Sequence, residues 1–177
     1  MSSDLLPVSE AAARLKIDRY LDCLLRWAPK INLTASATRD SAFDTLVAPV
    51  LGAEKLLHGH VIDVGSGNGS PALILAVLRP DLRFTLLEPR AKRWAFLREA
   101  AREMGLGNTT ALRERSDVYH GDLAATITMR AVGLEPARLR PLLEPGGCVL
   151  VFGGPDLEGA EALALPGRAR VQRQCFT

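Results

Sequence analysis

The feature that constrains the fold most is a glycine-rich segment that directly follows a short apolar run. Residues 60–64 read His-Val-Ile-Asp-Val and lead into Gly65-Ser-Gly-Asn-Gly69, with Pro71 two residues later. Glycine permits positive φ angles and lets the backbone approach a ligand closely, and proline suits the first turn of a helix. The segment therefore predicts a strand, a tight turn and a buried helix, with a ligand site at the turn.

Strands and helices are expected to alternate through the rest of the chain. Short apolar runs predict strands at 60–64, 82–87, 109–112, 124–129 and 148–152, and helical periodicity predicts helices at 72–78, 91–104 and 134–143. This alternation is typical of parallel βαβ units. We therefore expect an α/β fold with a doubly wound, mostly parallel, Rossmann-like sheet.

Two helices precede this core, and little regular structure is expected after it. One helix spans 9–28, with Ser9 as its cap, and another begins near Asp40 and ends or kinks at Pro49. Residues 144–147 indicate a turn, and 169–176 leave room for one last strand. A chain of 177 residues predicts a single domain, with a helical cap at 1–58, a core at 59–153 and a short tail at 154–177.

The formal net charge is only +2, but the charges are unevenly distributed. Residues 79–115 hold nine basic and five acidic side chains. This excess favours either a face for an anionic partner or a solvated basic helix, and the sequence leaves both open.

The three cysteines, Cys23, Cys148 and Cys175, form no C-x-x-C pair, as is typical of a reducing cytoplasm. We expect Cys148 to be a small buried side chain in a strand. The first residues lack the pattern of a signal peptide, and no apolar run approaches the roughly 20 residues of a membrane span. The histidines have no metal-ligand spacing, so we expect no metal, no membrane contact and a cytoplasmic location.

Two nucleotide-like ligands fit the glycine turn. A dinucleotide site has G-x-G-x-x-G, whereas Gly65, Gly67 and Gly69 are spaced Gly-x-Gly-x-Gly. This spacing resembles the first motif of class I S-adenosylmethionine (SAM)-dependent methyltransferases. Glu88, 19 residues after Gly69, ends the next strand, where an acidic side chain can bind ribose hydroxyls.

Longer motifs carry a closer resemblance. Trp27-x-x-Lys-Ile-Asn-Leu-Thr34, the segment 63–71, the segment 86–97, Met129-Arg-Ala-Val132 and Pro145-Gly-Gly147 follow one another in order. Over residues 10–155 the chain resembles the bacterial small-subunit ribosomal RNA guanine-N7 methyltransferase family, also called glucose-inhibited division protein B. The resemblance implies methyl transfer from SAM to guanine N7 of 16S ribosomal RNA, with S-adenosylhomocysteine as the product.

The resemblance also assigns site residues. Asp63 is expected near the cofactor's amino group, and the loop after the third strand near its adenine. The expected cofactor contacts are Asp63, Gly65, Ser66, Gly67, Gly69, Glu88, Pro89, Ser116, Asp117 and Arg130. For Asp63 a helix cap is the alternative, and for Ser116 and Asp117 it is a solvated run of charges.

On the substrate side, guanine N7 carries a lone pair and no proton, so no general base is expected. Arg130 and Asn32 are the candidates for positioning the base, and Lys92 and Arg93 for contacting RNA phosphate. The alternatives are a strand-end salt bridge for Arg130, a turn for Asn32, and solvent exposure for the other two.

The chain departs from the family pattern on the predicted RNA side. Ser41-Ala-Phe-Asp-Thr45 stands where the family has a basic stretch with histidine, and Phe152-Gly153 stands where it has Lys-Gly. The alternatives are therefore a non-catalytic homologue that binds SAM or RNA and a methyltransferase for a small molecule or protein. An NAD-dependent oxidoreductase is disfavoured by the glycine spacing. We expect a monomer, or a weak dimer that covers an exposed sheet edge.

Overall fold

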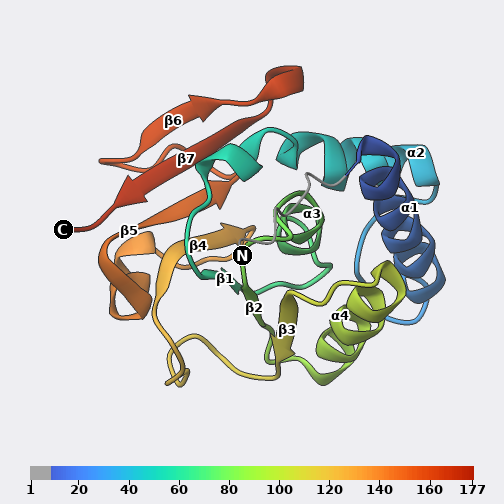
Figure 1. The fold of residues 1–177 in the computed structure, drawn as a ribbon, viewed down its shortest axis with the longest axis horizontal. Coiled ribbons are helices and arrows are strands. Elements are labelled where there is room, and N and C mark those ends of the chain that lie inside the picture. The colour runs from blue at the N-terminus through green and yellow to red at the C-terminus, as the bar shows by residue number, and fades with distance from the viewer. Residues whose placement is uncertain (1–8) are drawn as a thin grey trace, which may run out of the picture.

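The computed structural model describes residues 9–177, and the N-terminal segment examined for a signal peptide lies outside them. The chain begins with helix α1 (Glu10–Trp27), whose N-cap is Ser9, as predicted: the Ser9 hydroxyl accepts a hydrogen bond from the backbone N–H of Ala12. The buried side chains of α1 recur every three or four residues and face the core. Helix α1 packs against α4 (Ala91–Met104), beside which it lies in Figure 1.

The second helical segment is shorter and less regular than predicted. It consists of α2 (Arg39–Ala42), a π-helical turn η1 (Phe43–Val47) and a 3₁₀ turn η2 (Ala48–Val50), followed by η3 (Ala53–Leu56). The cap is Thr38, whose side chain accepts from the N–H of Ser41. Pro49 lies in η2 and cannot donate the backbone hydrogen bond of a continuing helix, so the expectation of a break at Pro49 is confirmed.

The sheet has the predicted doubly wound topology. Its strands are β1 (Val61–Val64), β2 (Phe84–Leu87), β3 (Thr109–Leu112), β4 (Ala124–Arg130), β5 (Leu143–Phe152), β6 (Glu161–Ala164) and β7 (Arg170–Cys175). They are ordered β3-β2-β1-β4-β5-β7-β6, and the first five are parallel. The strand order reverses between β1 and β4: β2 and β3 lie on one side of β1, and β4 and β5 lie on the other. In such folds, ligands bind at this point, beyond the carboxyl ends of the strands.

The C-terminal region is not shortened to one strand, and this expectation was wrong. Strand β7 pairs antiparallel with β5, and β6 pairs antiparallel with β7, at the upper left of Figure 1. A turn η5 (Pro166–Arg168) connects β6 to β7. The sequence concealed β6 because Glu161-Ala-Leu-Ala164 lacks β-branched and aromatic residues.

Two further expectations about the C-terminal half need correction. Residues 136–142 form a 3₁₀ helix, η4 (Pro136–Leu142), and not an α-helix. Pro136 and Pro141 lack the N–H donors that an α-helical ladder requires. Residues 144–147 are also not a separate turn: they lie within β5, where the register with β4 shifts at a bulge.

Two apolar clusters hold the sheet. The larger one joins α1, α3 (Ala72–Leu78) and α4 to one face, and includes Phe84, Leu150 and Val171. The smaller one covers the other face with side chains of η4, and includes Ile62 and Val149. Alternating residues of one strand, such as Val149 and Leu150, thus enter different clusters, as the two-residue period of a strand requires.

Cys148 is buried in β5, as expected, but it is not a free thiol. It forms a disulfide with Cys175, its direct partner in the antiparallel register of β5 and β7. Cys23 is a buried free cysteine. The cysteine spacing did not predict this bridge, because pairing depended on a strand register that the spacing did not reveal.

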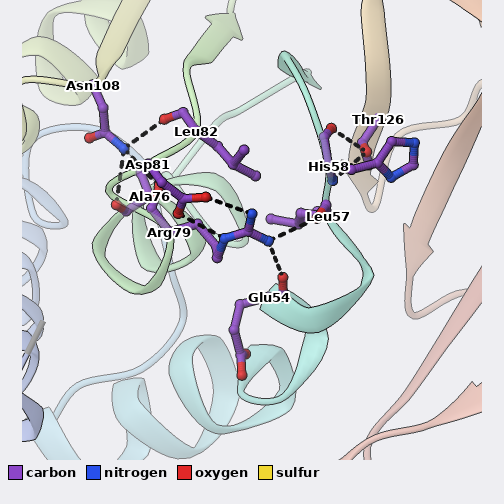
Figure 2. Close-up of polar contacts among 9 residues, drawn as sticks. All are labelled: Glu54, Leu57, His58, Ala76, Arg79, Asp81, Leu82, Asn108 and Thr126. Atoms are coloured by element: carbon purple, nitrogen blue, oxygen red, sulfur yellow. Dashed lines mark hydrogen bonds and ion pairs between the residues drawn. The ribbon is translucent and has the colours of Figure 1, made fainter. Parts of the chain in front are cut away.

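The end of the sheet opposite the glycine turn is fastened by polar side chains, shown in Figure 2. Arg79 donates to the carbonyl oxygens of Glu54 (2.9 Å) and Leu57 (2.8 Å) and forms an ion pair with Asp81. The side-chain amide of Asn108 donates to the carbonyl oxygens of Ala76, Arg79 and Leu82. The bond to Ala76 uses a backbone acceptor that the end of α3 leaves free, and the bonds of Arg79 connect the end of α3 with η3 and its C-cap. No described helix is long and apolar enough to span a membrane.

Candidate functional site

The glycine segment forms the expected turn at the carboxyl end of β1. Gly67 and Gly69 have φ angles of 48° and 86°, in the left-handed region. A Cβ atom at Gly69 would lie 2.5 Å from Leu73 Cδ1, so this glycine allows α3 to pack closely. A Cβ atom at Gly67 would meet nothing closer than 3.6 Å. A side chain at Gly67 would therefore make ordinary van der Waals contacts with Arg93 and with the carbonyl oxygen of Gly65, and it is the positive φ that favours glycine there.

Glu88 ties this loop to the neighbouring strand. It is 3% exposed; its Oε2 accepts from the N–H of Gly67 (3.0 Å), and its Oε1 accepts from the N–H of Arg90 (2.9 Å). Each carboxylate oxygen can accept a further hydrogen bond. Glu88, the residue predicted to bind the ribose hydroxyls, is thus buried at the loop and can still accept further hydrogen bonds.

Asp63 is buried in the centre of the sheet edge. Its Oδ1 accepts from the Thr128 hydroxyl at 2.6 Å, and its Oδ2 has no partner among the described residues. Burial, with a smaller contribution from the charge of Glu88, raises the pKa of this carboxyl to about 6. Ser66 donates its hydroxyl to the backbone carbonyl of Asp63. An unpartnered buried carboxylate oxygen is costly and suits a cationic ligand group.

Two cavities flank the glycine loop, and Gly65 lines both. The larger cavity has a volume of about 370 Å³ and lies over the ends of β1 and β2. The smaller cavity, about 170 Å³, lies between the loop and the end of β4. The larger cavity includes the predicted residues Pro89, Ser116 and Asp117, and the smaller one includes Ser66, Gly67, Arg93 and Arg130. Most of the predicted site residues are therefore brought to one edge.

Asp117 fits both interpretations of its segment. It lines the larger cavity, and it is an exposed residue whose carboxylate forms two hydrogen bonds of 2.9 Å with Arg115. This hydrogen bonding lowers the pKa of Asp117. A ligand in the cavity would share this carboxylate with Arg115.

Arg130 is at the end of β4 and joins two distant segments. It donates to the Ser70 hydroxyl (2.8 Å) and to the carbonyl oxygen of Thr45 (2.6 Å) in the π-helical turn η1. It has no carboxylate partner among the described residues, so the alternative of a strand-end salt bridge was wrong. Burial lowers the pKa of the guanidinium. Arg130 also lines a third cavity, of about 260 Å³, with Phe152 and Gly154.

The remaining predicted substrate residues occupy different positions. Arg93 donates to the backbone carbonyl of Asn32 at 3.1 Å and lines the smaller cavity. The side chain of Asn32 is exposed, and its neighbour Leu33 lines that cavity instead. Lys92 is exposed at the start of α4. The structure therefore gathers Arg93 and Arg130 at the cavity but leaves Asn32 and Lys92 at its periphery.

Three residues that lie near the site were not among the residues predicted for it. Tyr20 of α1 is fully buried and donates its hydroxyl to the carbonyl oxygen of Asn68 at 2.9 Å, which fixes the loop from outside the sheet. Thr128 hydrogen-bonds Asp63, and the non-glycine residue Ala131 has a φ of 52° beside Arg130. The helical period of α1 marked Tyr20 only as a core residue, and no sequence pattern pointed to Ala131.

The histidines do not form a metal site. The ring of His60 contacts the carbonyl oxygen of Leu123 and the hydroxyl of Thr85, at 2.9 and 2.8 Å. No cluster of metal-ligating side chains occurs in the part of the chain that the structure describes.

Comparison with solved structures identifies the fold. A SAM-dependent methyltransferase from Aquifex aeolicus superposes with a TM-score of 0.57 at 13% identity, over 77% of this chain and 93% of that one. A DhpI–SAH complex superposes with a TM-score of 0.51 at 22% identity, over 90% and 79%. The fold is that of class I SAM-dependent methyltransferases.

Comparison with known sequences identifies the family. A family model described as rRNA small subunit methyltransferase G matches residues 14–164. Ribosomal RNA small subunit methyltransferase G of Thermotoga sp. is 38% identical over 80% of this chain and 64% of its own length. The proteins of that name from Nocardioides sp. and Nitrosococcus oceani are 39% and 35% identical, over 68% and 88% of this chain. The chain spans 49% of the Nocardioides relative and 75% of the Nitrosococcus relative. The chain belongs to the rRNA small subunit methyltransferase G family, also called GidB.

Proposed function

We propose that the protein transfers a methyl group from SAM to N7 of a guanine in 16S ribosomal RNA. Membership of the family supports this reaction. The observation that carries the proposal is the buried Asp63 oxygen, which has no partner among the described residues and lies beside the glycine loop where the strand order reverses. That arrangement fits a ligand with a cationic amino group.

The chain's residues fit the two ends of the cofactor. Asp63 would accept from its ammonium group, and Glu88 from its ribose hydroxyls. The residues of the larger cavity, Pro89, Ser116 and Asp117, would surround its adenine. The loop residues Gly65, Ser66, Gly67 and Gly69 would pass between the two ends. The cofactor, when bound, supplies a methyl group on a sulfonium sulfur, whose C–S bond breaks as N7 forms the new C–N bond.

The protein's task in this reaction is positioning. Guanine N7 donates its lone pair without losing a proton, so no side chain has to act as a base. Arg130 keeps a guanidinium in the smaller cavity through its bonds to Ser70 and Thr45, and guanidinium matches the O6 and N7 acceptors of guanine. Arg93 and Lys92 would contact RNA phosphate, and Asn32 would contact the base or the cofactor from the rim.

We extend the proposal to the setting of the reaction. The substrate would be the small ribosomal subunit or its RNA, and the enzyme would act in the cytoplasm, as a monomer or a weak dimer. Residues 1–177 would act as one methyltransferase domain, with a helical cap at 1–58, a core at 59–153 and a tail at 154–177. The larger apolar cluster, which joins α1, α3, α4 and β7, supports one folding unit.

The test is incubation of the protein with tritiated SAM and undermethylated small subunits. We expect label in 16S ribosomal RNA, located as 7-methylguanine by nuclease digestion and chromatography. Binding of S-adenosylhomocysteine without label in RNA would support a non-catalytic homologue instead. Label in extract metabolites or proteins alone would support a different methyl acceptor.

A further inference from the structure

We propose that the groove between α4 and the outer edge of β3 is a docking surface for the phosphate backbone of the substrate RNA, separate from the methyl-transfer cavities. The inference rests on the proposed function, because it names the surface that would hold the same RNA away from the reacting base. We call this surface the α4–β3 groove. It is lined by Arg98, Arg102, Thr109, Thr110 and Ala111, together with apolar side chains.

The shape and donors of the α4–β3 groove suit an anion. The groove encloses about 300 Å³. Among the described strands, β3 pairs with β2 alone and ends the sheet, so the backbone N–H groups on its outer edge have no strand partner. Sheet edges of this kind form anion-binding concavities. The groove is also lined by Thr110, an exposed residue whose hydroxyl can donate a hydrogen bond.

One arginine that lines the groove, Arg98, stacks on an aromatic ring and forms no ion pair with a described residue. The indole N–H of Trp94 donates to the carbonyl oxygen of Ala111 at 3.0 Å, which ties α4 to the edge strand. The Arg98 guanidinium lies 4.9 Å from the centroid of the Trp94 ring. Stacking orients a guanidinium without neutralising it. Arg102, by contrast, forms an ion pair with Glu99 at 2.8 Å.

Further cations connect the groove with the methyl-transfer edge. Strands β2 and β3 are parallel, with Leu87 opposite Leu112, so Arg90 and Arg113 follow neighbouring strand ends. Arg90, Lys92 and Arg113 are exposed, and none forms an ion pair with a described residue. At the other end of β2, Arg83 is paired with Asp122 at 2.7 Å. The cations Arg90, Lys92, Arg113 and Arg98, which form no ion pair with a described residue, therefore make a strip of positive charge from the proposed site along α4.

These features favour RNA over an acidic protein as the partner. The groove offers guanidinium, hydroxyl and backbone N–H donors, which are the groups that contact phosphate oxygens. The strip of charge is continuous with a site whose proposed acceptor is an RNA base. Charges beside an edge strand can also serve only to prevent strand pairing, and the experiment below separates that role from docking.

The test compares two variants with the same loss of charge. Arg98→Gln/Arg113→Gln removes two cations of the strip, and Arg83→Gln/Arg173→Gln removes two cations that are ion-paired elsewhere. Filter binding of unmodified 16S ribosomal RNA, without cofactor, is measured as a function of salt. Each lost phosphate contact lowers the slope of log K against log salt by about 0.7 for single strands. We expect a slope lower by about 1.4 and affinity roughly tenfold weaker at about 0.15 M salt for the first variant, and little change for the control.

The outcomes are distinct from those of the proposed function. In the methylation assay the first variant should raise the KM for subunits more than it lowers kcat, with S-adenosylhomocysteine binding unchanged. Equal weakening by both variants, or an unchanged salt slope, would overturn the docking surface even if the wild-type protein methylates RNA. A raised KM for subunits with normal binding of naked RNA would also overturn it and point to a ribosomal protein. Salt-dependent RNA binding that needs Arg98 and Arg113, without methyl transfer, would refute only the proposed reaction.

Discussion

Replacing Asp63 with asparagine should change how the stability of the cofactor-free protein depends on pH. The carboxyl has a pKa of about 6 in the folded state, against 3.8 as its ordinary value. Between these pH values the unfolded chain loses the proton while the folded protein keeps it. The free energy of unfolding therefore falls as pH rises from about 4 to about 6, and the loss is complete above the folded pKa. The difference between the two pKa values corresponds to about 3 kcal/mol.

The asparagine side chain of this variant is neutral at every pH used, so the substitution removes this dependence. Its amide oxygen can still accept from Thr128, and any constant cost of the substitution is the same at all pH values. We therefore expect the difference in unfolding free energy between variant and wild type to move by about 2–3 kcal/mol in favour of the variant from pH 4 to pH 7. Urea unfolding followed by circular dichroism at several pH values measures it. A difference that does not change with pH would refute the raised pKa of the buried Asp63 carboxyl.

The same substitution should abolish cofactor binding, because the ammonium group would lose its carboxylate. For the wild type, calorimetry with S-adenosylhomocysteine should show affinity rising with pH up to about 6 and then levelling, since the ionised form binds. Unchanged affinity in Asp63→Asn would show that Asp63 has only a structural role. The substitution would thus remove the destabilising charge of Asp63 near neutral pH at the expense of the site.

Three further predictions concern the loop, the arginine and the disulfide. Gly67→Val should abolish S-adenosylhomocysteine binding in calorimetry and cost about 1–2 kcal/mol in urea unfolding, because φ is 48° there; retained binding would contradict the loop's role. Arg130→Ala should lower kcat by about 100-fold while leaving S-adenosylhomocysteine affinity within about twofold, and weakened cofactor binding alone would refute its positioning role. Cys148→Ser/Cys175→Ser should lose about 3.5 kcal/mol of unfolding free energy, from the sequence separation of 27. Reductant should lower the urea midpoint of the wild type only; equal midpoints would show that the bridge does not form.

The candidate site was predictable where one segment contained all the information. The glycine turn after β1 and the acidic residue after β2 depend on φ preferences and on the order of strands, which a local pattern carries. Asp63, Glu88 and the loop glycines were therefore found at the correct edge. For the RNA side, the sequence indicated residue types but not positions, because the exposure of Asn32 and Lys92 depends on what packs nearby.

The alternation of strands and helices, the cap of α1 and the ligand turn could be predicted from local patterns, because hydrophobic period, capping chemistry and glycine geometry act within a few residues. Tertiary packing set the bonds of Arg130, which reach 60 and 85 residues along the chain to Ser70 and Thr45. It also decided the pairing of β6 with β7 and the disulfide between Cys148 and Cys175. Each of these depends on the register and packing of segments far apart in sequence, which no local pattern encodes.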